Sequence, residues 1–331
     1  MQEVFGLNSF FMQNKKVKLR YVDTMSKNYK KEILWRLLNQ WYDIDTISDP
    51  DYVIHGGMGS DFIHYPNSVL IQVVGENIVP DFNVFDYAIG FDYIQFDDRY
   101  IRIPLYFFYD AYHKILKNEK PKTEGVCNRK FCSFVVSNAR HADPMRDNFF
   151  KALCSYKKVD SAGKHLNNVG GGYLHDKLDF ISHYKFNIAF ENCASRGYTT
   201  EKIVEPMAVN TIPIYWGNPL IERDFNKESF ICLNDFPTIQ ECINYIQLLD
   251  ENDDLYLNKL MQPWLHEKNR VDYEANLKMF FDNIFGQSSQ SAKRINRYGR
   301  QSVLEKKLMR FYEDNNPSRS IKYKLKKILK F

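Results

Sequence analysis

Residues 184–219 read YKFNIAFENCASRGYTTEKIVEPMAVNTIPIYWGNP and contain two apolar strand patterns, separated by a polar loop and a helix start. Residues 185–190 tend toward apolar and aromatic side chains, and residues 191–198 are polar or small. A charged helix start follows at Thr200-Glu201-Lys202, and a second apolar run covers residues 211–216. This order is typical of the strand–loop–helix–strand unit of parallel α/β sheets. Ligands of such sheets bind beyond the carboxyl ends of the strands, so residues 191–202 are expected to hold a nucleotide.

The rest of the chain continues this alternation of strands and helices. An amphipathic pattern predicts a helix over residues 29–41. Residues 117–130 are polar and are expected to connect two domains. We therefore expect an α/β chain with one domain at residues 1–125, a second at 126–286, and a tail at 287–331. Packing of the last helices of the second domain against the first domain is an open alternative. Further strands are predicted at residues 17–22, 52–55, 69–74, 87–91, 101–107 and 131–136, and further helices at 239–249 and 273–284.

Size and composition favour an intracellular globular protein. A chain of 331 residues with 44% hydrophobic residues can form two cores. The aromatic share of 15% suits sugar-binding surfaces, although core packing explains most of it. No N-terminal segment resembles a signal peptide, and no apolar run is long enough to cross a membrane. The six cysteines form no CxxC pair, which favours reduced thiols in the cytoplasm.

Positive charge is concentrated at the C-terminal end. Residues 287–331 hold thirteen Lys or Arg and three Asp or Glu, a net charge of +10. Because the whole chain carries +4, residues 1–286 carry −6. A nucleic-acid-binding protein would spread basic and aromatic residues over its folded face, so the acidic body argues against a nucleic-acid partner.

The last twelve residues, SIKYKLKKILKF, predict an amphipathic helix. Ile321, Leu325, Ile328 and Leu329 fall on one face, and lysines cover the other. This pattern is typical of a helix on an anionic membrane surface, and a solvated, partly disordered basic end is the alternative. We expect a cytoplasmic protein that is peripherally attached to the inner face of the cytoplasmic membrane.

Several ordered blocks of the sequence resemble one enzyme family. They are GENIVPDFNVFDYAIGFD at residues 75–92, RYIRIPLYF at 99–107, FVVSNARHADPMRDNFF at 134–150, and FENCASRGYTTEKI with IPIYWGNP within 184–219. Together they resemble the signature of glycosyltransferase family 10, the α-1,3-fucosyltransferases, and most of all the bacterial enzymes that build Lewis-type antigens. Several blocks in order are far more specific than a single motif.

The resemblance implies a GT-B architecture, in which two Rossmann-like domains face a cleft and the second binds GDP-fucose. It also implies an inverting transfer of L-fucose from GDP-β-L-fucose to the 3-OH of N-acetylglucosamine in Galβ1-4GlcNAc-type acceptors. The implied partners are GDP-fucose and an oligosaccharide ending in Gal-GlcNAc, and the tail adds an anionic membrane surface. An α-1,4 or dual-linkage fucosyltransferase, or a GT-B transferase of another sugar, stays open as an alternative.

Glu76 is the candidate general base. An inverting transfer needs one carboxylate that takes the proton of the acceptor hydroxyl. Glu76 follows a predicted strand and Gly75, and the resemblance puts it where the family's base stands. Without that resemblance, a glutamate in such a loop would more often be structural.

Arg146 and Lys202 are the candidates for holding the diphosphate. Asp143-Pro144 predicts a helix start, with Asp as the N-cap and Pro at the first position, so Arg146 lies in the first turn. Lys202 lies at a second helix start. Helix N-termini favour phosphates, and fixed cations there stabilise the charge that develops on the departing GDP. A surface salt bridge is the alternative for each residue.

The resemblance also assigns residues of the 191–202 loop. Glu201 matches the acid that binds donor hydroxyls and steadies the oxocarbenium-like sugar, although acids are common in first turns. Asn192 and Tyr198 match the nucleotide-sugar loop, with a turn former and a packing aromatic as the alternatives. Glu191 matches the motif without a clear role.

No metal site is expected. Asp43-Ile44-Asp45 and Asp49-Pro50-Asp51 resemble the DxD pattern of metal-dependent transferases, but they lie far in sequence from the phosphate-binding loops. Lys and Arg can neutralise a diphosphate without a metal cation, as the GT-B resemblance implies. The sequence therefore predicts that no cofactor is required and that a divalent cation is at most stimulatory.

Overall fold

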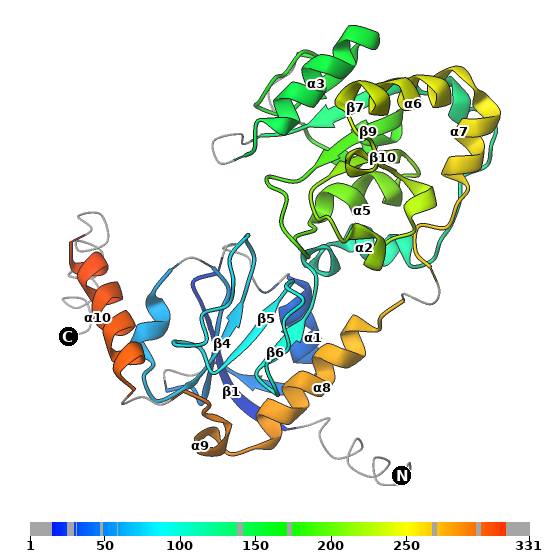
Figure 1. Cartoon of the computed structure of the whole chain (residues 1–331). Helices are drawn as coiled ribbons and strands as arrows, with labels where there is room; N and C mark the ends of the chain where they lie inside the picture. Colours follow the sequence, from blue (N-terminus) through cyan, green and yellow to red (C-terminus); the bar gives the residue numbers. More distant parts are fainter. Residues whose placement is uncertain are drawn as a thin grey trace. The chain divides into compact units, whose positions relative to one another are not determined.

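Figure 1 shows the computed structural model of the chain, which consists of two α/β units. It describes residues 15–24, 30, 32–46, 49–57, 59–137, 142–170, 174–266, 270–295 and 299–315. Unit 1 comprises Met1–Gly90, Ile94–Ile103 and Tyr273–Phe331, and unit 2 comprises Phe91–Tyr93 and Pro104–Asp272. Each unit has its own parallel sheet, which agrees with the α/β class and the two halves predicted from the sequence.

The sheet of unit 1 has the strand order β2-β1-β3-β4-β5-β6, and all of its pairings are parallel. The inner strands are apolar on both faces, as expected where helices or loops cover both sides of a sheet. Val53, Ile54 and Ile71, for example, are fully buried. The strands are β1 (Lys16–Val22), β2 (Asp43–Asp45), β3 (Tyr52–His55), β4 (Val69–Val73), β5 (Tyr87–Gly90) and β6 (Tyr100–Arg102).

The sheet of unit 2 has the strand order β11-β10-β9-β7-β8 and is also parallel throughout. From β7 the chain first adds β8 on one side of the sheet. It then adds β9, β10 and β11 on the other side, so the direction of strand addition reverses between β7 and β9. Such a switch point opens a crevice outside the carboxyl ends of its two strands. The strands are β7 (Lys130–Val135), β8 (Val159–Ala162), β9 (Tyr184–Phe190), β10 (Ile212–Trp216) and β11 (Ile231–Cys232).

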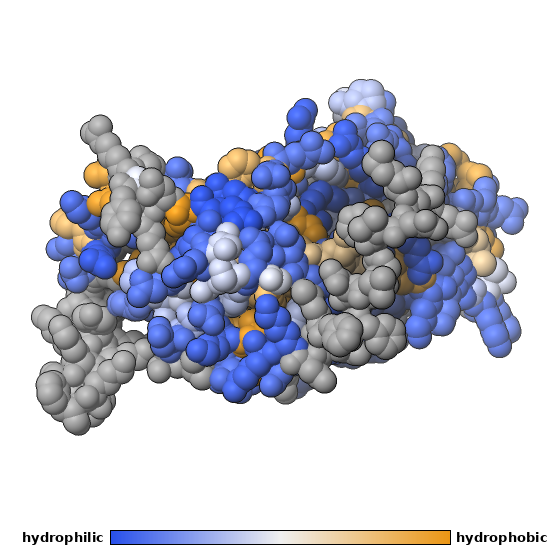
Figure 2. All heavy atoms as spheres, turned by 90° about the horizontal axis from the view of Figure 1, so that it is seen from below, coloured by the Kyte–Doolittle hydropathy of each residue, from blue (hydrophilic) through white to orange (hydrophobic). Residues whose placement is uncertain are grey.

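The helices complete each unit. In unit 1, α1 spans Ile33–Trp41 and buries one apolar face that includes Leu34 and Leu38. Three C-terminal helices join unit 1: α8 (Tyr273–Gly286), α9 (Ser289–Ala292) and α10 (Arg300–Asp314). Unit 2 contains α2 (Asp110–Ile115), α3 (Met145–Tyr156), α4 (Lys177–Ser182), α5 (Glu201–Ala208), α6 (Ile239–Glu251) and α7 (Asp253–Leu260). On the face shown in Figure 2 hydrophilic residues predominate.

The predicted boundary after residue 125 differs from the division in the structure, because the chain already belongs to unit 2 from Pro104 onward. The reason is α2, which buries Ala111, Tyr112 and Ile115 and packs against α5 of unit 2 (Figure 1). The strand predicted at residues 101–107 is also wrong in its second half. β6 ends at Arg102, and Leu105–Phe108 form a 3₁₀ helix after Pro104.

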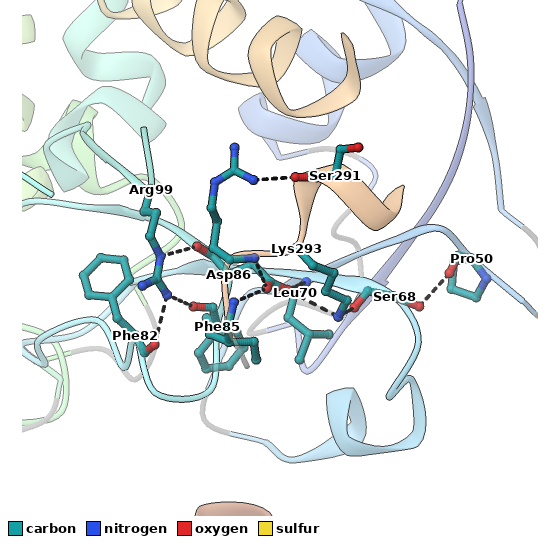
Figure 3. A network of polar contacts seen from close by, with 11 residues as sticks. Pro50, Ser68, Leu70, Phe82, Phe85, Asp86, Arg99, Ser291 and Lys293 are labelled. Atoms are coloured by element: carbon teal, nitrogen blue, oxygen red, sulfur yellow. Dashed lines mark hydrogen bonds and ion pairs between the residues drawn. The ribbon is translucent and has the colours of Figure 1, made fainter. Parts of the chain in front are cut away.

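The segment that follows α9 is part of unit 1, although the sequence placed it in a separate basic tail. The Asp86 carboxylate is fully buried and accepts hydrogen bonds from the backbone N–H groups of Leu70 (2.8 Å), Arg294 (2.8 Å) and Ile295 (3.0 Å). The Lys293 ammonium lies 3.4 Å from the same carboxylate. Figure 3 shows Asp86 at the centre of this network. Two of the basic residues counted in the tail, Lys293 and Arg294, therefore help to hold unit 1 together.

The remainder of the tail is only partly described. The amphipathic pattern predicted at residues 320–331 lies outside the described residues. On α10, Leu304, Leu308 and Phe311 are exposed and follow one another at helical spacing. Among the residues that the structure describes, no helix has both the length and the apolar character that a transmembrane span requires.

Candidate active site

The switch point of unit 2 brings Arg146 and Asn192 together. Arg146 lies in the first turn of α3 after β7, and Asn192 follows β9. The Arg146 Nη1 atom donates to the Asn192 side-chain oxygen over 2.8 Å, and the Asp143 N–H donates to the Asn192 carbonyl over 2.8 Å. The Asp143 carboxylate accepts from the Met145 N–H over 2.8 Å, but α3 begins at Met145 with Pro144 as its N-cap, one residue later than the sequence predicted. A cation is thus held at the crevice where α/β sheets bind ligands.

Arg146 is almost fully buried, with 1% of its surface exposed. Burial lowers the pKa of its guanidinium, and the nearby Asp147 and Glu191 oppose that change. The side chain nevertheless stays charged, because an arginine pKa is far above physiological pH. An exposed surface salt bridge, the alternative for this residue, does not describe such a buried cation.

Glu191 anchors the start of α5 from the end of β9. Its carboxylate, which is fully buried, accepts from the Thr200 N–H (2.7 Å), from the Thr200 hydroxyl (2.8 Å) and from the Lys202 ammonium (3.1 Å). Burial raises the pKa of Glu191, and Lys202 opposes that rise. Glu191 therefore fixes the helix N-terminus and the lysine relative to the sheet, a role that its motif had left open.

Lys202 keeps part of its surface accessible, since 19% of its side chain is exposed. The ammonium donates to Glu191 and to the Thr200 hydroxyl (2.9 Å), and the Glu201 carboxylate lies 3.6 Å away. Burial opposes the charged ammonium, but the two glutamates overcome this cost and raise the pKa of Lys202. The result is a permanent cation at the N-terminus of α5, where an anion is favoured.

Glu201 is held ionised on the same helix turn. Burial alone would raise the pKa of its carboxyl group, but Lys202 and Lys177 more than compensate and lower it. Lys177, the first residue of α4, also pairs with Glu205 one turn further along α5. Acidic and basic side chains therefore alternate around the start of α5. Among them, Glu201 is ionised at neutral pH and can accept hydrogen bonds.

The Tyr198 ring packs in the interior, 5.3 Å from the Phe91 ring. The Tyr198 phenol group acts to raise the pKa of both Arg146 and Lys202. The ring packing against Phe91 agrees with the packing role that the sequence left open. All six candidates from unit 2 belong to one cluster: Arg146, Glu191, Asn192, Tyr198, Glu201 and Lys202.

Sequence reasoning missed the residues that support this cluster. A Cβ atom on Gly217 would lie 2.5 Å from the Glu191 Cγ atom, so only glycine leaves room for the buried carboxylate. Asn218, also fully buried, accepts from the N–H groups of Gly197 and Leu220 and donates to the Thr199 hydroxyl. The signal was present in the sequence, because Gly217-Asn218-Pro219 directly follows β10 at the ligand-binding edge of the sheet.

Glu76 lies in unit 1, two residues beyond Val74, whose N–H group still donates to the Ile89 carbonyl of β5. It is half-buried, and its carbonyl accepts from the Ile78 N–H over 2.7 Å. Its position at the carboxyl edge of the sheet is the one that the sequence predicted for a base.

Unit 1 has a second polar pair at this edge, which sequence reasoning also missed. Asp23 follows β1 and His55 ends β3, and the two side chains are buried 3.6 Å apart. His55 also contacts the Gly59 carbonyl over 3.1 Å. Burial lowers the pKa of His55, so the imidazole is neutral at physiological pH. The glycines at positions 56, 57 and 59 marked this turn in the sequence.

Within the described ranges, no group of three or more His, Cys, Asp or Glu side chains is arranged to hold a metal ion. Of the two DxD-like pairs, the one at residues 43–45 forms β2, where Asp45 pairs with Lys16 over 3.1 Å. The cysteines are all free thiols.

Comparison with known proteins agrees with this geometry. The family model described as "Alpha-(1,3)-fucosyltransferase FucT N-terminal domain" matches residues 19–109, and "Glycosyltransferase family 10 (fucosyltransferase) C-term" matches residues 127–279. The chain is 36% identical over 302 residues to the alpha-(1,3)-fucosyltransferase FucT of Helicobacter pylori. That match covers 79% of this chain and 61% of the relative, so the chain spans about three fifths of the relative's length.

Solved structures show the same relationship in three dimensions. A crystal structure of an alpha1,3-fucosyltransferase with GDP-fucose has a TM-score of 0.71 and 30% identity, covering 87% of this chain and 94% of the other. A structure of an alpha1,3-fucosyltransferase with GDP has the same score and identity, covering 83% and 91%. The predicted fold class is confirmed as GT-B, an architecture of two Rossmann-like units. The chain belongs to glycosyltransferase family 10, the fucosyltransferases, as its ordered sequence blocks predicted.

Proposed function

We propose that this chain transfers L-fucose from GDP-β-L-fucose to the 3-OH of N-acetylglucosamine in Galβ1-4GlcNAc-type acceptors, with inversion at the anomeric carbon. The observation that supports it most is the pair of cations at the ligand-binding edge of unit 2: Arg146 is bonded to Asn192, and Lys202 is bonded to the adjacent Glu191. Similar proteins have been crystallised with GDP-fucose and with GDP.

In this proposal, Arg146 and Lys202 bind the diphosphate of the donor. When the bond from the anomeric carbon to the phosphate oxygen breaks, its electron pair goes to GDP, and the diphosphate gains negative charge. Cations that are already in position stabilise that charge without reorganisation, and so they lower the barrier. They also replace the charge of a metal ion, and we infer that the transfer requires no divalent cation.

Glu76 and Glu201 act on the two reacting sugars. The acceptor oxygen forms its bond to the anomeric carbon from the face opposite the diphosphate, and its proton passes to the Glu76 carboxylate. Glu201, which is ionised, accepts hydrogen bonds from fucose hydroxyls and stabilises the positive charge that develops on the ring. Asn192 holds Arg146 in place, and Glu191 holds Lys202.

Substituting Gln for Glu76 should reduce fucose transfer by about 10²–10⁴-fold, the usual contribution of a general base. Gln keeps the shape of the side chain but cannot take the proton. GDP binding, which depends on unit 2, should stay unchanged in calorimetry. Transfer at a near-normal rate by Glu76→Gln would remove this residue from the role of the base.

The substrates require a direct assay. The protein should be incubated with GDP-fucose and a panel of acceptors that end in Galβ1-4GlcNAc, Galβ1-3GlcNAc or glucose, and the linkage in each product should be determined by NMR. Products in the α-1,3 linkage on Galβ1-4GlcNAc are expected. Absence of GDP binding would refute the donor, whereas binding of GDP with only α-1,4 products would refute the linkage alone.

We further propose that the C-terminal region attaches the protein to the inner face of the cytoplasmic membrane. The support is the basic pattern of residues 320–331 together with the exposed Leu304, Leu308 and Phe311 of α10. Truncation after Arg300 should abolish sedimentation with anionic phosphatidylglycerol vesicles while turnover of soluble substrates stays largely intact. Vesicle binding by the truncated protein would contradict this attachment, and vesicles of neutral phosphatidylcholine serve as the control.

A further inference from the structure

The loop that carries Glu76 also exposes two aliphatic side chains. Ile78 and Val79, which follow Glu76 by two and three positions, are 40% and 67% exposed. In the same connection between β4 and β5, the aliphatic side chains of Val74 and Val84 are buried. Unit 1 therefore covers other aliphatic residues of this connection and leaves the two beside Glu76 at the surface.

Both ends of this loop are fixed to the sheet. At its start, the Val74 N–H donates to the backbone of β5 over 2.9 Å. At its end, the Asp81 N–H donates over 2.9 Å to the side-chain oxygen of Gln72, a buried residue of β4. Pro80 lies against the end of β5, since a Cβ atom on Gly90 would be 3.5 Å from its Cγ atom. The exposed side chains thus belong to a short loop with fixed ends.

Ile78 and Val79 stay close to Glu76 along this loop. The Ile78 N–H donates to the Glu76 carbonyl over 2.7 Å and closes a three-residue turn. Because consecutive Cα atoms are about 3.8 Å apart, the Val79 Cα atom lies within about 11 Å of that of Glu76. A general base must be within hydrogen-bond distance of the hydroxyl that it deprotonates. A sugar bound at Glu76 therefore comes within reach of both aliphatic side chains.

The proposed acceptor has an apolar group next to the hydroxyl that reacts. In N-acetylglucosamine, the acetamido group is on the ring carbon adjacent to the one that carries the 3-OH, and glucose has a hydroxyl in its place. The acetamido group ends in a methyl. Binding sites combine apolar surface with a few placed polar groups, and covering a methyl group with aliphatic side chains is favourable.

We propose that Ile78 and Val79 are specificity-determining residues, which contact the acetamido methyl group of the acceptor and favour N-acetylglucosamine over glucose. This inference rests on the proposed function, because it assumes that Glu76 takes the proton from the 3-OH. The two side chains take no part in bond making or breaking. Their loss should change the choice of acceptor and leave GDP binding, which depends on unit 2, unchanged.

The test compares Galβ1-4GlcNAc with Galβ1-4Glc, which differ only in the acetamido group. The double variant Ile78→Ser/Val79→Ser should lower kcat/KM for Galβ1-4GlcNAc by about tenfold, the lower end of what a small apolar contact contributes to substrate discrimination. Its kcat/KM for Galβ1-4Glc should change by less than about twofold. Hydrolysis of GDP-fucose by water, which uses no sugar acceptor, is the second reference reaction and should also change by less than about twofold.

Two control variants accompany this comparison. Met279→Ser removes a side chain that is 69% exposed on α8 of the same unit, and it should leave all three reactions unchanged. Ile78→Leu/Val79→Leu keeps the aliphatic character of both positions and should retain the preference for Galβ1-4GlcNAc.

An equal loss with both acceptors and in hydrolysis would overturn this inference, because it would show that the loop only supports the structure. Unchanged turnover of Galβ1-4GlcNAc by the serine double variant would overturn it as well. Melting temperatures of all variants separate these results from loss of folding. Failure of the proposed function looks different, because the unmodified protein would then form no α-1,3 product on Galβ1-4GlcNAc.

Discussion

Replacing Lys202 by Met is expected to reduce fucose transfer by about 10²–10³-fold and to weaken GDP binding in calorimetry. The loss is large because the ammonium is a fixed charge at the site where the departing diphosphate becomes more negative. It also leaves the Glu191 carboxylate fully buried with Thr200 as its remaining partner at the start of α5. Lys227→Met is the matched control, since it removes a more exposed lysine of unit 2 that pairs with Asp235.

The same variant should have a characteristic pH dependence of stability. The pKa of Glu191 is raised by burial, and the loss of Lys202 removes the charge that opposes this rise. A carboxyl group with a raised folded-state pKa contributes stability at low pH, and that contribution is lost as the pH rises through the folded-state value. The melting temperature of Lys202→Met should therefore fall further below that of the unmodified protein at pH 8 than at pH 5. A transfer rate within about twofold of normal would contradict the role of Lys202.

Truncation after Ala292 is expected to destabilise unit 1 by about 3–5 kcal/mol, the usual cost of leaving a buried charge without its partners. It removes Lys293 and the N–H groups of Arg294 and Ile295, and it leaves the Leu70 N–H group on the buried Asp86 carboxylate. It also removes the Arg294 side chain, which pairs with Asp98. The effect should appear as a lower unfolding midpoint in urea. Truncation after Arg300, which keeps residues 293–295, is the control and should unfold near the midpoint of the full chain.

A substitution at Asp86 separates this effect from other consequences of shortening the chain. Asp86→Asn should destabilise the full-length protein, because Lys293 and the backbone donors then lose a charged acceptor. In the protein truncated after Ala292 the same substitution should be stabilising, since it removes the uncompensated charge. If Asp86→Asn changed stability in the same direction in both backgrounds, Asp86 would not be the residue that links residues 293–295 to unit 1.

The polar loops after strands β4, β7 and β9 were predictable because a change from apolar runs to polar residues is local. Parallel strands direct those loops to one edge of each sheet, so Glu76, Glu191 and Lys202 could be assigned to ligand-binding edges from the sequence. Their chemical identities came from the resemblance to family 10, since spacing alone carries no information on guanosine or fucose.

The contacts between side chains within the cluster could not be predicted from local sequence patterns. Arg146 and Asn192 meet because β7 and β9 are neighbours although β8 lies between them in the chain, and that order follows from how the whole sheet packs. The buried role of Glu191 depends on Gly217 at the end of a different strand.

The sequence by itself determined the α/β class, the strand edges with their candidate residues, and the family. Tertiary structure decided where the units divide and which buried charges have which partners. It also decided that residues 293–295 belong to unit 1, although their basic character had placed them in a separate tail. The physical reason is the sequence separation over which each kind of interaction acts. Periodicity and capping involve residues a few positions apart, whereas a buried charge such as Asp86 is satisfied by whichever distant segment the packing brings to it.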